Sequence, residues 1–362
     1  MAGQQPLRRL GLDTELVRRM TSNGLHTVGD LLSRTELQLV QGLDLNRREV
    51  VSLLLSISGR IAPDTKTAGD LLRERREAGG NFFVATGLPT IDNSLQQGGF
   101  PTGMITELVG PAGIGKTQTC LTTAAQACLP ASVGGLGKDC GVVFLDTERK
   151  FSPDRLVEIA RARFPEHYGD SCPEGLERLL NQVMVYTVDN SAALLDRLES
   201  LQARIIEGNV RLIILDSIAA LARRDFTREN TVKRQDLLTR QAAVLKSLAY
   251  TFSAVVLVTN QVTTTSWSTS SVRGHPDLIA SHVNSSSRPR GGMCETEVLE
   301  GRQDSYVIPS LGNTWHHCVS NRVILEQHES HREMHLTKSP LAPRVSCWFT
   351  VRDTGLEEVS RV

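Results

Sequence analysis

The chain has 362 residues, of which 40% are hydrophobic and 22% charged, with 40 basic and 40 acidic side chains. This composition is typical of a globular protein with one large core and room for a small additional domain, and it excludes disorder throughout. Because the formal net charge is zero, binding to nucleic acid would require locally clustered positive charge.

The seven cysteines are an odd number and form no CxxC pair, which favours reduced thiols in a cell interior over disulfides or a thiolate zinc site. The N-terminus lacks the apolar core of a signal peptide. No run approaches the roughly 18 apolar residues that a membrane span needs. We therefore expect an intracellular, soluble protein with no membrane partner.

Residues 1–63 contain short helical patterns that are separated by glycines such as Gly24 and Gly42, which indicates a small all-helical domain. Residues 64–84 follow Pro63, carry charges of both signs and include Gly79 and Gly80. We interpret this segment as a linker.

Residues 85–362 alternate apolar, strand-like segments with amphipathic helical ones. The strand-like segments are MITELV, GVVFLD, VMVYTV, RLIILD and AVVLVT. This pattern predicts an α/β core, in which a mostly parallel sheet is covered by helices on both faces. The last sixty residues resemble antiparallel strands added at one side, with DTG as a hairpin turn.

One segment fits the phosphate-binding pattern G-x-x-x-x-G-K-[ST], lies between a strand and a helix, and predicts a nucleotide site. Lys116 would reach the β- and γ-phosphates, and the Thr117 hydroxyl would be a Mg²⁺ ligand. The candidate phosphate-binding residues are Gly110, Pro111, Ala112, Gly113, Ile114, Gly115, Lys116, Thr117 and Gln118.

Polar residues at the ends of three other strands could complete this site. Asp216 ends RLIILD and could hold the Mg²⁺ shell, although strands also end in Asp as a helix cap. Glu148 follows GVVFLD and could orient the attacking water, although it could equally be a solvated loop charge. The segment VVLVTNQV ends in Thr259, Asn260 and Gln261, uncharged side chains that could sense a γ-phosphate.

Two basic regions could contact single-stranded nucleic acid. The first follows Asp216 and could instead be a solvated helix face; its candidates are Arg223, Arg224, Arg228, Lys233 and Arg234. The second is a long loop over 262–310, rich in Ser and Thr, which could instead be a disordered insertion; its candidates are Arg273, Arg288 and Arg290.

Three histidines near the C-terminus, His328, His331 and His335, have a spacing that raises the possibility of a metal site. The pattern places His328 and His331 on either side of a hairpin turn and His335 in the return strand. We interpret them as surface histidines.

The segments GPAGIGKTQ, FLDTE, IILDS, TNQV and TKSPLAP, in this order after a small helical module, resemble the eukaryotic RecA-like strand-exchange recombinases. The resemblance covers nearly the whole chain. Within this family, LVEIARARFP, LGNTWHHCVSNRVIL and TKSPLAP are similar to the B-type paralogue and differ from the recombinase itself.

The resemblance implies a helix-hairpin-helix domain before a RecA-like P-loop ATPase core. It also implies a nuclear, DNA-dependent ATPase of homologous recombination and double-strand-break repair. Such a protein would bind single-stranded and branched DNA, act with other recombinase paralogues in a hetero-oligomer, and assist assembly of the recombinase filament.

The same resemblance assigns roles to individual residues. Lys116 and Glu148 would be catalytic with ATP, Thr117 and Asp216 would hold Mg²⁺, and Gln261 would begin the second DNA loop. The segment 223–240 would contain the first DNA loop, and 340–343 would belong to a strip that caps ATP.

Two departures from the recombinase matter. The second loop is much longer, and Thr65 stands where the recombinase carries an aromatic residue in its polymerisation hook. Two other functions remain open: an ordinary P-loop enzyme such as a small-molecule kinase, and a scaffold that binds ATP with negligible hydrolysis.

Overall fold

The computed structural model describes residues 5–62, 65–77, 81–95, 98–226, 230–266, 305–328 and 331–360. The chain forms two compact units, Met1–Gly79 and Gly80–Val362. No helix in the described ranges is long and apolar enough to cross a membrane.

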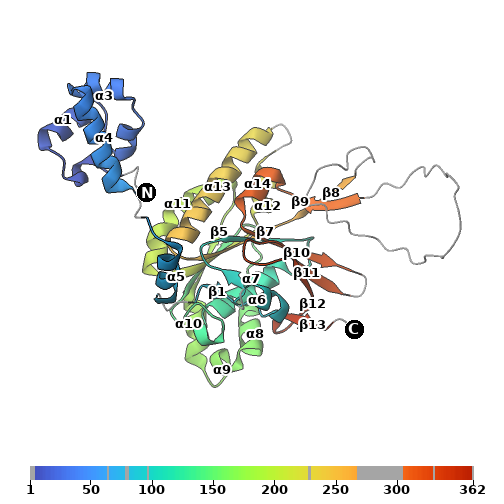
Figure 1. Cartoon of the computed structure of the whole chain (residues 1–362). Helices are drawn as coiled ribbons and strands as arrows, with labels where there is room; N and C mark the ends of the chain where they lie inside the picture. The colour runs from blue at the N-terminus through green and yellow to red at the C-terminus, as the bar shows by residue number, and fades with distance from the viewer. Residues whose placement is uncertain are drawn as a thin grey trace, which may run out of the picture. The chain divides into compact units, whose positions relative to one another are not determined.

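The first unit is helical, as the sequence predicts (Figure 1). Its elements are the 3-10 helix η2 (Leu7–Leu10) and the helices α1 (Thr14–Ser22), α2 (Val28–Leu32), α3 (Glu36–Leu43), α4 (Arg47–Ile61) and α5 (Ala68–Glu77). Reciprocal capping boxes begin α2, α3 and α4 at Thr27, Thr35 and Asn46. The apolar faces of η2 and α1–α4 pack into one small core that includes Met20, Leu39 and Ile57.

Helix α5 lies within the segment that the sequence suggests is a linker. Thr67 and Asp70 exchange hydrogen bonds at its start, where the Asp70 amide donates to Thr67 Oγ1 and the Thr67 amide donates to Asp70 Oδ2, each at 3.1 Å. The charged residues that suggest a linker are therefore also compatible with an exposed helix. The hydrogen bonds at its start and the Arg73–Asp70 ion pair stabilise this helix.

Within the described residues, the second unit is built on a nine-stranded sheet in the order β13-β12-β11-β10-β3-β7-β6-β4-β5. The strands are β3 (Ile105–Val109), β4 (Gly141–Asp146), β5 (Val183–Thr187), β6 (Val210–Asp216), β7 (Val255–Asn260), β10 (Asn321–Gln327), β11 (Arg332–Lys338), β12 (Val345–Arg352) and β13 (Gly355–Val359). The strands from β10 to β5 in this order are parallel, and β11, β12 and β13 are added antiparallel beside β10. The predicted fold class is confirmed.

Helices cover both faces of the sheet because its strands are apolar on both sides. Val142 and Phe144 of β4 face a core formed with α7–α10, and Val143 and Leu145 face a second core formed with α11–α14. The helices are α6 (Pro89–Ser94), α7 (Lys116–Ala127), η3 (Ala131–Val133), α8 (Pro153–Arg163), α9 (Pro165–Tyr168), α10 (Pro173–Gln182), α11 (Ser191–Glu207), α12 (Ile218–Asp225), α13 (Thr231–Thr251) and α14 (Gly312–Cys318).

Among the residues that the structure describes, the second unit also contains two short strand pairs. Strands β1 (Phe83–Val84) and β2 (Phe100–Pro101) pair at its beginning. Strands β8 (Val262–Ser266) and β9 (Ser305–Pro309) pair antiparallel and form the two ends of the predicted long loop (Figure 1).

Candidate functional site

The predicted phosphate-binding loop connects the end of β3 to the start of α7. Gly113 and Gly115 have φ angles of +77° and +122°, which side chains with a Cβ rarely adopt. A Cβ at Gly110 would lie 2.8 Å from the Leu325 carbonyl oxygen of β10. The glycines therefore allow a tight loop that leads into a helix N-terminus, where backbone N–H groups are available to phosphate oxygens.

Lys116 is the first residue of α7, and its side chain folds back over the loop. Its ammonium donates to the carbonyl oxygens of Gly110 and Pro111, each at 2.8 Å. Burial lowers the pKa of Lys116, and the carboxylates of Asp216 and Glu148 partly oppose this shift. The cation is thus held at the loop that would receive the phosphates.

Asp216 and Thr117, 99 residues apart in the sequence, meet at the ends of β6 and the loop. Thr117 Oγ1 donates to Asp216 Oδ2 at 2.6 Å, and Thr259 Oγ1 of β7 donates to Asp216 Oδ1 at 2.5 Å. Burial raises the pKa of Asp216, although both threonine hydrogen bonds act in the opposite direction. A hydroxyl and a carboxylate side by side are oxygen ligands of the kind that Mg²⁺ takes, so these residues fit the predicted ion.

Glu148 lies on a turn that Asp146 organises. The Asp146 carboxylate accepts hydrogen bonds from the amides of Glu148, Lys150 and Phe151 at 3.1, 3.2 and 2.8 Å. This turn directs Glu148 toward Asp216, because β4 and β6 are neighbours with Asp146 opposite Asp216.

The Glu148 carboxylate contacts three other groups of the site. Its Oε1 accepts from Ser217 Oγ at 3.0 Å and from Gln261 Nε2 at 3.2 Å, and its Oε2 pairs with the Lys150 ammonium. Burial raises the pKa of Glu148, but the bonds from Lys150 and Ser217 outweigh it, so the pKa lies below its usual value.

These groups surround one cavity of about 320 Å³, within the range of small-ligand sites. Its lining residues are Ala112, Gly113, Gly115, Lys116, Thr117, Gln118, Glu148, Lys150, Asp216, Ser217 and Gln261. Of the other predicted loop residues, Ile114 packs into the core, while Gly110 and Pro111 contribute carbonyls to Lys116.

Two residues of the cavity, Lys150 and Ser217, are not among those predicted from the sequence. Lys150 follows the predicted carboxylate by two positions in TERKF, and that spacing could have been noticed. Ser217 is the N-cap of α12 and accepts a hydrogen bond from the Ala220 amide. Because capping alone explains a serine at this position, the sequence does not indicate its bond to Glu148.

The basic candidates of the first region fall into two groups. Arg223, Arg224 and Lys233 are exposed at the end of α12 and the start of α13, and Arg224 donates to the Thr147 carbonyl at 3.1 Å. Arg234 is partly buried and donates to the Ser310 carbonyl at 2.8 Å, and burial lowers its pKa. The remaining candidates lie outside the described residues: Arg228, Arg273, Arg288 and Arg290.

A buried polar network lies behind the site, between β3, β7, β10 and α14. Glu107 accepts from Arg322 Nε at 2.7 Å, from Asn260 Nδ2 at 2.7 Å and from Trp315 Nε1 at 2.8 Å. Asn260 Oδ1 in turn accepts from the Gln261 amide and from Ser310 Oγ. The network therefore fixes the backbone at both ends of the long loop.

Comparison with known proteins gives matches over both units. The Rad51 family matches residues 80–284, and the family described as XRCC3/RpoA-like, helix-hairpin-helix domain matches residues 7–61. The latter agrees with the helix-hairpin-helix expectation for the first unit.

Curated relatives align with most of the chain. Human DNA repair protein RAD51 homolog 2 is 36% identical over 358 residues, which cover 98% of this chain and 89% of that protein. The mouse protein of the same name is 37% identical over 354 residues, with 97% and 96% covered. DNA repair and recombination protein RadA of Cenarchaeum symbiosum (strain A) is 31% identical over 252 residues, with 68% and 60% covered. The chain therefore belongs to the Rad51 family and has its RecA-like core.

Proposed function

We propose that this protein is a Mg²⁺-dependent, DNA-stimulated ATPase with weak turnover, which acts in homologous recombination and double-strand-break repair. It works in the nucleus as a recombinase paralogue in a hetero-oligomer, binds single-stranded and branched DNA, and assists assembly of the recombinase filament. The names of its relatives, which describe DNA repair and recombination proteins, support this assignment.

The geometry of the cavity supports a separate role for each of its residues. Lys116 binds the β- and γ-phosphates, and Thr117 with Asp216 would hold Mg²⁺, which offsets phosphate charge when bound. Glu148 orients the attacking water, and Gln118 and the loop amides hold the nucleotide. Arg155 Nε donates to Gln118 Oε1 at 2.8 Å and positions that side chain.

One observation carries the link to DNA. Gln261 donates to Glu148 Oε1 at 3.2 Å and directly precedes β8, where the long loop begins. Binding of DNA by that loop would therefore move or fix a side chain that touches the hydrolytic carboxylate. Among the exposed cations, Arg223, Arg224 and Lys233 are the candidates for phosphate contacts near the same site.

The test is single-turnover ATP hydrolysis with and without single-stranded DNA. DNA should accelerate the wild-type protein, and Glu148→Gln should bind ATP but hydrolyse it about 100-fold more slowly or worse. Glu174→Gln, an exposed glutamate at the start of α10, is the matched control and should turn over normally. Wild-type turnover by Glu148→Gln would remove Glu148 from the mechanism.

A second function, an ATP-binding scaffold with negligible hydrolysis, is favoured by Lys150. Its ammonium pairs with Glu148 and helps to lower the pKa of that carboxylate, which makes Glu148 a weaker base. Tight ATP binding without turnover, with or without DNA, would support the scaffold and contradict the ATPase.

The exposed segment around Pro340 and Pro343, between β11 and β12, is the candidate ATP cap between subunits. Within this chain, Ser339 Oγ donates to Asn321 Oδ1 at 2.8 Å and accepts from the Leu341 amide at 3.1 Å. These contacts anchor the segment to the start of β10, which pairs with β3.

A further inference from the structure

A cluster of histidines and glutamates occupies the tip of the β10–β11 hairpin, apart from the residues that line the nucleotide cavity. Glu326 lies directly opposite Glu333, and Ile324 opposite His335. Side chains alternate along a strand, so Glu326, Glu333 and His335 project from one face of the hairpin. His328 follows β10 and His331 precedes β11, and both reach the same cluster.

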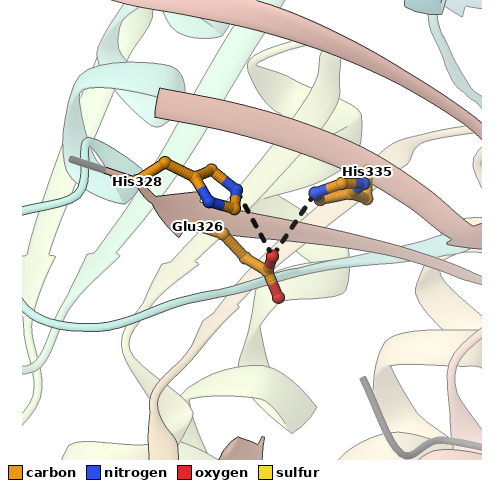
Figure 2. A group of neighbouring side chains, drawn as sticks. All are labelled: Glu326, His328 and His335. Atoms are coloured by element: carbon orange, nitrogen blue, oxygen red, sulfur yellow. Dashed lines mark ion pairs between the residues drawn. The ribbon is translucent and has the colours of Figure 1, made fainter. Parts of the chain in front are cut away.

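The nitrogen and oxygen atoms of this cluster converge (Figure 2). His335 Nε2 and His328 Nε2 lie 3.5 and 3.8 Å from the same atom, Glu326 Oε2. Glu333 Oε2 lies 3.5 Å from His328 Nε2 and 3.7 Å from His335 Nε2. The donor atoms of Glu326, His328 and His335 all lie within 4.8 Å of one another.

These separations are close to those of a metal site. Zinc bonds of about 2.0–2.1 Å in a tetrahedron place neighbouring donor atoms roughly 3.3 Å apart. The nitrogen–oxygen separations of 3.5–3.8 Å exceed that value by a few tenths of an ångström. The two imidazole nitrogens lie within 4.8 Å of each other, and side-chain rotations would bring them to the same spacing.

Two independent features indicate a cation at this position. The Nε2 atoms of His328 and His335 are buried and have no hydrogen-bond partner, and a buried polar nitrogen is normally satisfied. In addition, the carboxylates of Glu326 and Glu333 lie directly opposite each other on paired strands, where like charges repel, and the imidazoles beside them supply positive charge only when protonated. A bound cation would satisfy both requirements.

We propose that Glu326, His328 and His335 bind one divalent transition-metal ion of the zinc class, with Glu333 and His331 beside them. Imidazole nitrogen with a carboxylate suits zinc, whereas Mg²⁺ takes oxygen ligands, so this site differs in selectivity from the one at Thr117 and Asp216. The ion joins both strands of the hairpin next to its turn and holds them in register.

The surroundings provide an optical signal. The His331 ring stacks between those of His328 and Trp348, with centroid distances of 4.7 and 3.9 Å. Binding of Co²⁺, a common spectroscopic substitute for zinc, should therefore quench the Trp348 fluorescence and produce visible absorption from a site with nitrogen and oxygen ligands.

The experiment uses the full chain, treated with a chelator and free of nucleotide, titrated with ZnCl₂ by calorimetry and with CoCl₂ by absorption and fluorescence. We expect one ion per chain, a higher Tm with zinc, no competition from excess Mg²⁺, and weaker binding on acidification because protons compete for imidazole. The double variant His328→Ala with His335→Ala should bind zinc at least about 100-fold more weakly. Loss of a residue that only hydrogen-bonds to a metal ligand already lowers metal affinity by about 10- to 100-fold, and this variant removes two of the ligands themselves.

His317→Ala is the matched control, since His317 is an exposed histidine outside the cluster and should leave binding unchanged. If the double variant does not fold, His335→Gln, which is similar in size, replaces it in the same titration. Absence of binding at micromolar zinc would overturn the proposal and leave only imidazolium–carboxylate pairing. Equal binding by wild type and the cluster variants would also overturn it.

Discussion

The buried network around Glu107 gives a large and quantitative prediction. The Glu107 side chain has no exposed surface, the Arg322 side chain is 3% exposed, and their charged groups meet at 2.7 Å. Glu107→Ala would leave the Arg322 guanidinium buried without its carboxylate and would remove the acceptor of Trp315 Nε1. Breaking a buried pair in this way costs about 3–5 kcal/mol in the free energy of unfolding. At about 2–4 °C per kcal/mol, the Tm should fall by roughly 6–20 °C.

The measurement is urea denaturation followed by far-UV circular dichroism and by fluorescence. Glu107→Ala with Arg322→Met removes both charges and should recover a large part of the loss. Glu207→Ala breaks an exposed pair with Arg204, in which both side chains are 64% exposed, and should change stability by less than about 1 kcal/mol. A cost below about 1 kcal/mol for Glu107→Ala, or a double variant as unstable as the sum of the single ones, would refute the reasoning.

Four further outcomes follow from the site and its surroundings. Lys116→Ala should weaken binding of a fluorescent ATP analogue by at least about tenfold, because a charge-assisted phosphate contact is lost, and a normal circular dichroism spectrum would show that the fold persists. Removing Arg223 and Arg224 together should reduce the log–log salt dependence of DNA affinity by about 1.4–1.8 units, and an unchanged slope would place the binding surface elsewhere. Burial raises the pKa of Asp216 in the folded state above its unfolded value of about 3.9. Protonated Asp216 therefore stabilises the fold at a pH below about 3.9, and this stabilisation is lost as the pH rises through the folded-state pKa. Asp216→Asn should therefore be more stable than wild type near pH 7 but not at pH 3, as urea titrations at both pH values can show. Burial of an aromatic ring in a neighbouring subunit's pocket would contribute roughly 2–3 kcal/mol of binding free energy, and Thr65 lacks such a ring. Sedimentation of the unmodified chain with an ATP analogue should therefore detect no long filaments, and Thr65→Phe should promote them.

The parallel core could be predicted from the sequence because its strands carry an unmistakable pattern. Runs such as RLIILD and AVVLVT are apolar on both sides, and only a sheet covered on both faces buries them. The nucleotide cavity could also be predicted in outline, because the loop before Lys116 has a fixed spacing. Carboxyl ends of parallel strands share one edge of the sheet, which brings Asp216 and Glu148 toward the same loop.

Contacts between side chains that are distant in the sequence could not be predicted in the same way. Lys150 pairs with Glu148 only because the Asp146 carboxylate curls the turn that carries both. Whether Arg234 is exposed depends on the position of Ser310, which lies 76 residues later. The convergence of His328 and His335 depends on the register of a hairpin, and a shift of one residue would move the strand residue to the other face.

The position of β10 beside β3 also has consequences for synthesis of the protein. Asn321 pairs with Thr106, 215 residues earlier, so the strand that leads into the nucleotide loop acquires this neighbour only when most of the chain has been made. At about 5–20 residues per second, roughly 10–40 s separate the emergence of the two strands from the ribosome. Throughout that interval Leu108 and Val109 lack their partners Val323 and Ile324, and an unpaired apolar strand edge is prone to aggregate. A premature stop before residue 321 would make this condition permanent, so such truncated products should depend on chaperones and be degraded rapidly.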